Sequence, residues 1–441
     1  MRMTPGVLFL AVACEAPALP PPDVAVSGYV PSVVTGAWSG EAEAVSLVAL
    51  DDAGKEVSRW TAEAGEEGKW RAVSFGLHPA TRYHFAVEVQ SDGATAKSEA
   101  VELSTGGAPD ALEPLVVEEN TRNDGFFATG AITSTPWAVI YDAEGVPVWW
   151  WAVADPEALV TRVRRCADGQ TLLVNAFEGI NLDPESGMHL YRVAYDGKLV
   201  EDISMLGAHH DYVELPDGGL AWLAYEERTE EGSSHVGDLV VERDADGQTR
   251  EVWNAFDWYD WRDYEVETTS SFLHANVLNY DANRDVYWLS LRNPGAYIAV
   301  DRSTGKIVET LLGPESDVRL VASPAPSHPH GFRWLDDETL LLMDNRDSED
   351  EVSRVARYVV DREEDVMAQE WAFASDQGIH LLGLGDVTKL PNDDVVALWS
   401  TAGQIQRLDE DDATVWRATA PIGTAFAYIE WTDSTDTRPW P

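Results

Sequence analysis

Five hairpin-forming segments recur along the chain after about residue 115, and this repeat constrains the fold more than any other feature. Aligned on their first turn, the segments begin at Thr161, His210, His274, His330 and Gly385. Each alternates apolar and polar residues, turns at a cluster rich in Gly, Asn or Asp, and returns as a second strand. A second hairpin follows, as in AYIAVDRSTGKIVETLLG and GQIQRLDEDDATVWRATA. Two hairpins make a four-stranded sheet, and sheets repeated at this spacing are typical of β-propeller blades.

The repeat therefore predicts an all-β chain whose residues 115–441 form a six-bladed β-propeller. Upstream of the five segments, AVIYDAEGVPVWWW supplies a further outer hairpin. The C-terminal stretch AFAYIEW is expected to complete a sheet shared with the first blade. A seven-bladed propeller and a two-sheet barrel are the alternatives, and the even spacing favours them less.

A separate β-rich unit precedes the repeat. Residues 23–105 alternate in runs such as VSLVALD and YHFAVEVQ, without a helical period. The segment GLHPATRYHFAVEVQSDG resembles the late strands of a fibronectin type III domain, which predicts a small β-sandwich before the propeller. Residues 106–114, GGAPDALEP, are expected to be a linker.

The first residues have the pattern of an export signal. Residues 1–14 combine a basic start, a short apolar run and a cysteine after small residues. This is similar to a bacterial lipoprotein signal, which would make Cys14 the lipidated first residue; an ordinary secretory signal is the alternative. Residues 15–22 are then a Pro-rich tether. We therefore expect an extracytoplasmic protein, periplasmic or on the cell surface, with a membrane anchor only at Cys14.

The net charge bears on which partners the chain can bind. There are 31 Lys and Arg against 77 Asp and Glu, a net charge of −46. Such a surface repels nucleic acid and anionic membrane, so we expect neither as a partner. An anionic substrate would have to be held by a local cluster of positive or hydrogen-bonding groups.

Three histidines at one repeat position form such a cluster. Because the first strand of each blade lines the central channel, His210, His274 and His330 are expected to converge at one mouth. A hairpin returns to where it began, which brings Arg292 back beside His274. Three imidazoles and a guanidinium in an acidic protein predict an anion site.

Weaker candidates lie next to these four residues. Because each hairpin returns to where it began, Asn293 is expected beside Arg292, Asn345 and Arg346 beside His330, and Tyr225 beside His210. Asp211 is a candidate for orienting His210 or a neighbouring ring. By strand alternation, His209 is expected to point to the opposite face from His210. No role is assigned to the remaining histidines of the repeat region, which are His189, His235 and His380.

Four segments carry a family resemblance: HHDYVELPDGG, SFLHANVLNYDANRDVYWLSLRNPGAYIAVDRSTGKIV, HPHGFRWLDDETLLLMDNRD and GDVTKLPNDDVVALWSTAGQIQRLD. They resemble the bacterial arylsulfotransferases, most specifically in the His-Ala-Asn followed by Ser-x-Arg-Asn of the second segment. The resemblance covers most of the chain after about residue 110. It implies a six-bladed propeller with an N-terminal β-sandwich. It also implies transfer of a sulfuryl group from a phenolic sulfate ester to a phenol, without a nucleotide donor and without a cofactor.

The resemblance also implies roles for individual residues. His330 matches the histidine that takes the sulfuryl group as a sulfohistidine. His210 and His274 match those that bind the sulfate oxygens and handle the phenolic proton, and Arg292 matches the arginine that clamps the sulfate. The chain departs from the family in the residues around His330, which is followed by Gly331 and preceded by Ser-His-Pro. It also lacks the family's disulfide, because Cys166 is the only cysteine besides Cys14.

Two other classes of function remain open from the sequence. Three inward histidines also suit a zinc or iron site with an open position, although Gly385 leaves the repeat short of a fourth. A non-catalytic surface lipoprotein whose sandwich and propeller bind glycan or protein is the other alternative.

Overall fold

The computed structural model describes residues 19–122, 124–177, 187–230, 232–264, 271–346, 348 and 350–432. The predicted signal segment and Cys14 lie outside these residues. Contacts between Cα atoms divide the chain into two compact units. Residues 19–25, Thr35–Ser74 and Arg82–Ser104 belong to the first unit, and Val26–Val34, Phe75–Thr81 and everything from Thr105 onward belong to the second. No helix in the described part of the chain is long and apolar enough to cross a membrane.

The first unit is built of two antiparallel sheets. One contains, in spatial order, β1 (Asp23–Val26), β2 (Val34–Ser39), β6 (Lys69–Val73) and β5 (Glu63–Ala64), with the short 3-10 helix η1 (Glu66–Gly68) leading into β6. The other contains β4 (Glu56–Thr61), β3 (Ala44–Leu50), β7 (Arg82–Ser91) and β8 (Ala94–Lys97), and β9 (Val101–Ser104) also pairs with β7. The fibronectin type III resemblance of this unit stays a prediction.

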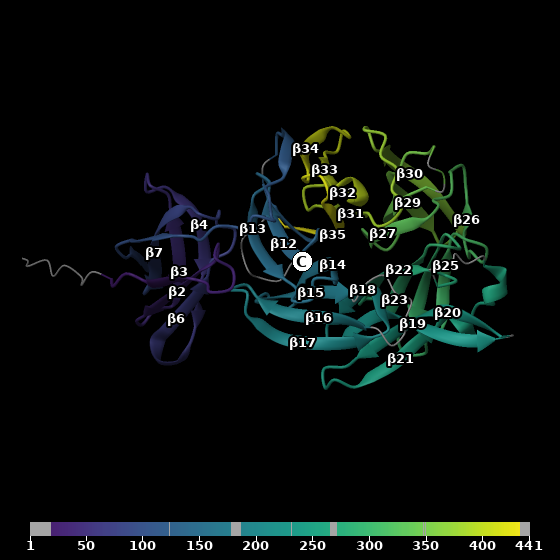
Figure 1. Ribbon diagram of the computed structural model, residues 1–441, viewed down its shortest axis with the longest axis horizontal. Helices are drawn as coiled ribbons and strands as arrows, with labels where there is room; N and C mark the ends of the chain where they lie inside the picture. The colour runs from purple at the N-terminus through teal and green to yellow at the C-terminus, as the bar shows by residue number, and fades with distance from the viewer. Residues whose placement is uncertain are drawn as a thin grey trace, which may run out of the picture. The chain divides into compact units, whose positions relative to one another are not determined.

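The described residues of the second unit form six sheets, which confirms the predicted all-β propeller class (Figure 1). In three of these sheets the four strands lie side by side in sequence order, from the innermost strand to the outermost. They are β14 (Leu159–Arg165), β15 (Thr171–Phe177), β16 (Gly187–Ala194) and β17 (Leu199–Leu206); β18 (Ala208–Glu214), β19 (Leu220–Glu230), β20 (Ser233–Arg243) and β21 (Thr249–Asn254); and β22 (Ala275–Asp281), β23 (Val286–Leu291), β24 (Ala296–Asp301) and β25 (Ile307–Leu311). The 3-10 helices η2 (Ala255–Asp257) and η3 (Trp261–Asp263) follow β21.

Each of the other three sheets includes one strand that is out of chain order. They are β27 (Pro329–Trp334), β28 (Thr339–Asp344), β29 (Arg354–Asp361) and β30 (Val366–Ala374), with β26 (Arg319–Leu320) parallel to β30; β31 (Asp386–Lys389), β32 (Val395–Trp399), β33 (Gln404–Leu408), β34 (Thr414–Thr419) and β10 (Val116–Asn120); and β35 (Ala425–Thr432), β11 (Phe126–Ile132), β12 (Trp137–Asp142) and β13 (Pro147–Ala152). The 3-10 helix η4 (Ser400–Ala402) links β32 to β33.

The ring of sheets is closed by both ends of the second unit. The C-terminal strand β35 pairs with β11, with Phe127 opposite Trp431, which confirms the predicted sharing of a sheet with the first blade. The early strand β10 pairs with β34 of the last sheet, with Val116 opposite Thr419. Because each end of this unit is hydrogen-bonded into a sheet made largely of distant residues, the propeller has no free first or last blade.

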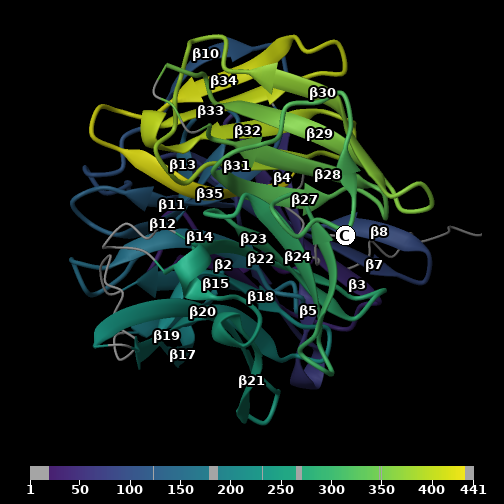
Figure 2. The same ribbon diagram turned by 90° about the vertical axis from the view of Figure 1, so that its right-hand side faces the viewer.

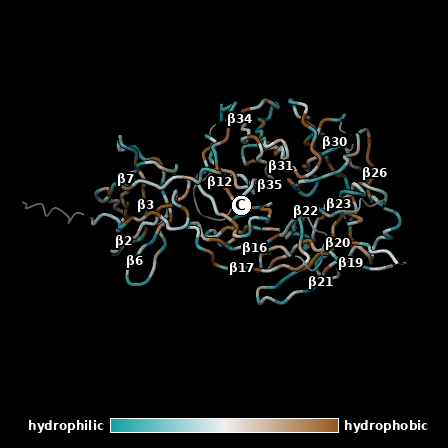
Figure 3. The backbone as a smooth tube through the Cα atoms, in the orientation of Figure 1, coloured by the Kyte–Doolittle hydropathy of each residue, from teal (hydrophilic) through white to brown (hydrophobic). Residues whose placement is uncertain are grey.

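Burial on both faces explains the composition of the middle strands. Every residue of β23, VYWLSL, is buried, and so is every residue of β32, VVALW. A short continuous apolar run of this kind is expected of a strand covered on both faces, because each blade packs between two others. In Figure 3 the exposed turns between strands are mainly hydrophilic, whereas hydrophobic stretches follow the strands.

Candidate functional site

The inner strands of the six sheets surround a common centre. In Figures 1 and 2, strands β14, β18, β22, β27, β31 and β35 lie next to one another there. In three of these inner strands the pairing with the next strand is irregular close to His210, His274 or His330. The register shifts between His209 and Tyr212 in β18, between Ala275 and Val277 in β22, and between Pro329 and Phe332 in β27. A bulge of this kind re-aims side chains, and bulges are common next to active sites.

The backbone is strained at two of the predicted histidines. His210 has a φ of 52° and His274 a φ of 54°, both in the left-handed region. For a residue with a Cβ this conformation costs about 1–2 kcal/mol, and such strain is typically retained where it orients a functional side chain.

The four principal candidates are brought together. The rings of His210 and His274 lie edge to face with centroids 5.1 Å apart. The Arg292 backbone N–H donates to the His274 carbonyl at 3.1 Å, so the arginine returns beside this histidine as the hairpin argument predicted. His330 follows Pro329 in the next blade, and the Pro329 carbonyl accepts from the Asn276 side chain, two residues after His274, at 2.9 Å. His330 is only 3% exposed, and burial, with His210 and Arg292 nearby, lowers its pKa. The three histidines and Arg292 therefore lie in one neighbourhood.

The expectation that His209 points away from His210 is wrong. The Nδ1 atoms of the two rings are 2.8 Å apart, and the rings stand at 90° to each other. His209 also stacks on Tyr225, with centroids 3.8 Å apart. Tyr225 therefore contacts His209, although it was predicted beside His210. Strand alternation fails here because the bulge after His209 and the left-handed backbone of His210 turn both rings toward each other.

Asp211 does not hydrogen-bond a histidine ring in the described residues. It is fully buried and forms an ion pair with Arg162, with Oδ1 2.9 Å from Nε. Its Oδ2 accepts from the backbone N–H of Leu278 in the next blade at 3.1 Å. Asp211 therefore ties inner strands together, and it acts on His210 only through its charge, which opposes the lowering of that ring's pKa.

A network of charged side chains links the inner strands. Three arginines and three carboxylates take part: Arg162, Arg164, Arg333, Asp211, Asp386 and Glu430. Arg162 is fully buried, and its guanidinium lies 3.9 Å from the centre of the Tyr428 ring. The Tyr428 ring is in turn 5.9 Å from the His330 ring. Arg162 is not among the residues that the sequence predicts for the site, although it follows Thr161 at the repeat position.

Gly331, the departure from the family next to His330, has a local structural cause. A Cβ at Gly331 would lie 2.1 Å from Oδ1 of Asp386 and 2.6 Å from its Cα. The Gly331 backbone N–H also donates to the Gly385 carbonyl at 3.1 Å. Glycine is required because the Asp386 carboxylate of the central network packs directly against this backbone.

The remaining weaker candidates have other partners. The Asn293 amide donates to the Ser271 and Phe272 carbonyls, and its Oδ1 accepts from Nη1 of Arg292 at 3.2 Å. It therefore holds the arginine in place. The Asn345 amide donates to the Leu384 carbonyl at 2.9 Å. Arg346 forms ion pairs with Asp344 and Glu351, so its charge is balanced by these two carboxylates.

The site histidines are electrically neutral at neutral pH. Burial, reinforced by Arg292 and opposed by Asp211, lowers the pKa of His210 to about 4. Burial, His210 and Arg292 also place the pKa values of His274 and His330 well below their usual range. A neutral imidazole keeps a lone pair for attack and an N–H for donation. Cys166 is buried, and burial raises the pKa of its thiol to about 12, so it is not reactive.

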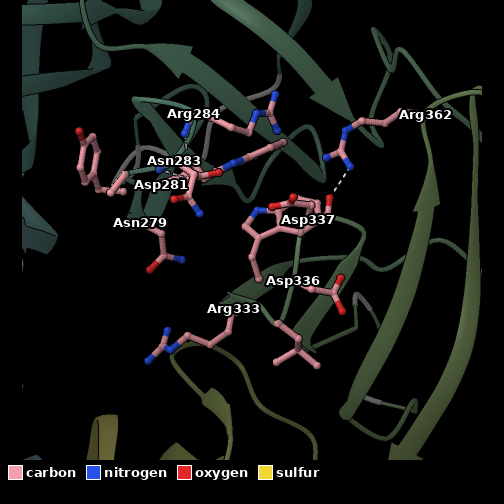
Figure 4. Close-up of a pocket in the computed structure, with 13 residues that line it drawn as sticks. Asn279, Asp281, Asn283, Arg284, Arg333, Asp336, Asp337 and Arg362 are labelled. Carbon is pink, nitrogen blue, oxygen red and sulfur yellow. Dashed lines mark hydrogen bonds between the residues drawn. The ribbon is translucent and has the colours of Figure 1, made fainter. Parts of the chain in front are cut away.

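A distinct cavity of about 360 Å³ lies at the turn end of β22 and β27, away from the histidine end of these strands. Figure 4 shows Arg284, Arg333 and Arg362 around it together with Asp281, Asp336 and Asp337. Because the two sets of charges balance, this cavity lacks the positive excess that the anion site needs.

One family model matches the chain. It describes arylsulfotransferases (ASST) and covers residues 114–398, well over half of the chain and all four principal candidates. No curated protein matches the chain. Among solved structures, a protein of unknown function from Bacteroides caccae is 12% identical, with a TM-score of 0.45, over 69% of this chain and 98% of that chain. An inactive virginiamycin B lyase from Staphylococcus aureus with quinupristin is 14% identical, with a TM-score of 0.41, over 73% and 96%. Both similarities are too low to bear on function.

Proposed function

The chain belongs to the arylsulfotransferase family, and from this premise we propose that it moves a sulfuryl group from a phenolic sulfate ester to a phenol through a sulfohistidine at His330. One observation carries the proposal: His210, His274 and His330 lie at the starts of three neighbouring inner strands, with Arg292 returning beside His274, in a protein of net charge −46. The donor is an aryl sulfate and the acceptor a phenol, and no nucleotide donor is needed. We also propose an extracytoplasmic location, which rests on residues 1–14 alone.

The state of His330 supports its role as nucleophile. Its ring is buried and neutral, and its Nδ1 has no hydrogen-bond partner among the described residues. A neutral imidazole attacks sulfur with a ring lone pair, the S–O bond to the donor phenol breaks, and the phenolate leaves. The acceptor phenol then attacks the same sulfur, and the S–N bond to His330 breaks. This is a ping-pong cycle in which one difficult step is divided into two.

The other three residues bind and neutralise the transferred group. The sulfuryl oxygens carry spread negative charge, as in phosphoryl transfer, and planar guanidinium donors match two of them at once. Asn293 supports this geometry because it accepts from Arg292 and is itself held by two backbone carbonyls. His210 and His274 can donate ring N–H groups to the remaining sulfuryl oxygens. A bare ring nitrogen of either histidine can accept the phenolic proton.

The metal alternative is supported less well by the geometry. Within the described ranges, the one group of three side chains close enough to share a metal ion is His78, Asp142 and Glu144. That group contains none of the three site histidines, whose nearest pair of rings has centroids 5.1 Å apart.

A direct assay tests the proposed function. Purified protein is incubated with 4-nitrophenyl sulfate and a panel of phenols, and release of the coloured phenolate is followed together with formation of the new sulfate ester. The proposal requires both products in equal amounts. Folded protein that transfers to no phenol across a broad panel would contradict it.

Arg292→Met is expected to reduce kcat/KM for the aryl sulfate by about 10²–10³-fold, because it removes a preorganised cation from the developing charge. Arg292→Lys should retain part of the activity, since lysine keeps the positive charge but lacks the planar guanidinium that can donate to two oxygens at once. Arg284→Met is the matched control. Arg284 lies at the turn-end cavity and pairs with Glu309 at 2.7 Å, so this variant should keep its activity. Steady-state kinetics on the three variants measures the difference, and equal losses in Arg292→Met and Arg284→Met would contradict the clamp.

A further inference from the structure

A chain of buried polar side chains leads from the site histidine His210 into the sheet behind it. His210 Nδ1 lies 2.8 Å from His209 Nδ1. His209 Nε2, at the other side of its ring, lies 3.4 Å from Oδ1 of Asp238, in β20 of the same sheet. His209 is 3% exposed and Asp238 0%, so this path is closed to water.

Asp238 is fixed in place by the strand that carries His274. Its Oδ1 accepts from the Ser271 hydroxyl at 2.8 Å and from the Ala275 backbone N–H at 3.2 Å. The Ser271 hydroxyl also accepts from the backbone N–H of His274 at 3.2 Å. One carboxylate therefore connects the backbone around His274 with the ring that touches His210.

The 3.4 Å contact between His209 Nε2 and Asp238 is within ion-pair distance but is not a hydrogen bond, so this step of the path has unused hydrogen-bonding capacity. Neither His209 Nε2 nor Asp238 Oδ2 makes a hydrogen bond within the described residues, although both atoms are buried. Leaving such groups unpaired costs about 1–3 kcal/mol each, so a structural role alone does not account for them. The stacked Tyr225 ring fixes the orientation of the His209 ring but forms no hydrogen bond with either atom.

We propose that His209 and Asp238 form a proton relay that sets which ring nitrogen of His210 carries its proton. The proposal rests on the proposed sulfuryl transfer. Because Nδ1 of His210 faces His209, its Nε2 is the nitrogen left for the substrate. If His209 donates from Nδ1, His210 presents an Nε2–H, which is an acid. If His209 accepts at Nδ1, His210 presents a bare Nε2, which is a base.

The relay balances the protons of the ping-pong cycle. When His330 attacks sulfur and the S–O bond breaks, the leaving phenolate takes the Nε2 proton of His210. His210 then takes the Nδ1 proton of His209, and His209 takes a proton at Nε2 from Asp238, which becomes a carboxylate. When the acceptor phenol attacks the sulfohistidine and the S–N bond breaks, its proton enters at His210 Nε2 and the relay runs backward to Asp238. Each full cycle moves one proton from acceptor to donor oxygen.

The protonation energetics are suited to this exchange. Burial raises the pKa of Asp238 to about 7, against the opposing hydrogen bonds from Ser271, Ala275 and His274. Burial and the His210 ring lower the pKa of His209, with the Ala224 carbonyl opposing them. Burial therefore favours a protonated carboxyl on Asp238 and a neutral ring on His209, which are the starting states that the relay requires. The other titratable groups near the two rings are Tyr225, Asp211, His274, His330 and Arg292.

His209→Phe and Asp238→Asn test the relay with two donors. His209→Phe keeps the stacking on Tyr225 and removes both nitrogens. The quantity to compare is kcat/KM for the donor, because in a ping-pong cycle it reports only the first half-reaction and not the acceptor step that both donors share. Each variant should lower kcat/KM for phenyl sulfate by about 10–100-fold, as loss of a supporting partner does. For 4-nitrophenyl sulfate kcat/KM should fall much less, because its phenolate leaves without an acid. Equal losses with both donors, or no loss with either, would overturn the relay.

His189→Phe provides the matched control. His189 also stacks on a tyrosine, Tyr191, and pairs with a carboxylate, Asp202 at 2.7 Å, but it lies on the surface of the neighbouring sheet. Its variant should transfer from both donors at the wild-type rates. A donor-dependent loss in His189→Phe like that in His209→Phe would overturn the assignment to the buried pair.

A nuclear magnetic resonance measurement separates failure of the relay from failure of the proposed function. In wild-type protein with ¹⁵N-labelled histidine, the relay predicts a coupling across the hydrogen bond between the two Nδ1 atoms. It also predicts that Asp238→Asn changes the tautomer balance of His210. Absence of the coupling overturns the relay even in an active enzyme. A coupling in wild-type protein that transfers no sulfuryl group supports the hydrogen bond and contradicts the proposed function.

Discussion

Replacing His330 with asparagine is expected to lower sulfuryl transfer by at least about 10⁴-fold, because removal of a covalent nucleophile leaves only binding and charge stabilisation. Asparagine is close in size and keeps a hydrogen-bonding group, so the neighbouring Tyr428 and Gly331 should keep their positions. The loss should appear with every donor, good leaving groups included. Initial rates with 4-nitrophenyl sulfate, at equal concentrations of folded protein, measure it.

His380→Asn controls for the substitution itself. His380 follows the last strand of the same sheet, and its Nδ1 lies 3.1 Å from the Glu351 carbonyl rather than in the site. This variant should transfer at close to the wild-type rate. Substantial activity in His330→Asn would show that His330 is not the nucleophile. Substrate binding should persist in this variant, since Arg292 and the other two histidines are unchanged.

Arg162→Met is expected to destabilise the second unit by about 3–5 kcal/mol, the cost of breaking a buried ion pair from one side. The arginine is fully buried, and Asp211, Asp386 and Glu430 together outweigh the burial that opposes its charge. Without it, Asp211 and Asp386 would be left at the centre of the propeller with fewer cations. Chemical denaturation followed by tryptophan fluorescence gives the free energy of unfolding.

Arg357→Met is the control for this prediction. Arg357 pairs with Glu370 at 2.7 Å on the surface, with 31% and 55% of the two side chains exposed. Exposed pairs contribute about 0–1 kcal/mol, so this variant should change little. A double variant, Arg162→Met with Asp211→Asn, should recover part of the stability because one unpaired charge is removed as well. If Arg162→Met cost no more than Arg357→Met, the network would not be a source of stability.

The repeat made the propeller and the meeting of three histidines predictable from sequence. Its period is regular because every blade needs the same four-stranded unit with the same turns. Residues at one repeat position then share one end of the ring, which is why His210, His274 and His330 could be placed together without any contact information. Arg292 followed from the antiparallel return of the hairpin, and the hydrogen bond to the His274 carbonyl confirms that position.

The supporting residues could not be read from the repeat. His209 was assigned to the opposite face because an ideal strand alternates, and the bulge between His209 and Tyr212 breaks that alternation. Asp238 lies in the third strand of its sheet, where nothing in the local pattern points toward the centre. The partner of Asp211 was missed because Arg162 comes from another blade, and only the closed ring brings the two side chains together.

Intact-mass analysis after incubation with an aryl sulfate, without acceptor, shows whether His330 becomes sulfated. A sulfohistidine at His330 predicts that wild-type protein gains one sulfuryl group of about 80 Da, that added phenol removes it, and that His330→Asn never gains it. An unchanged mass in a protein that turns over aryl sulfate, or the same gain in His330→Asn, would contradict the sulfohistidine at His330.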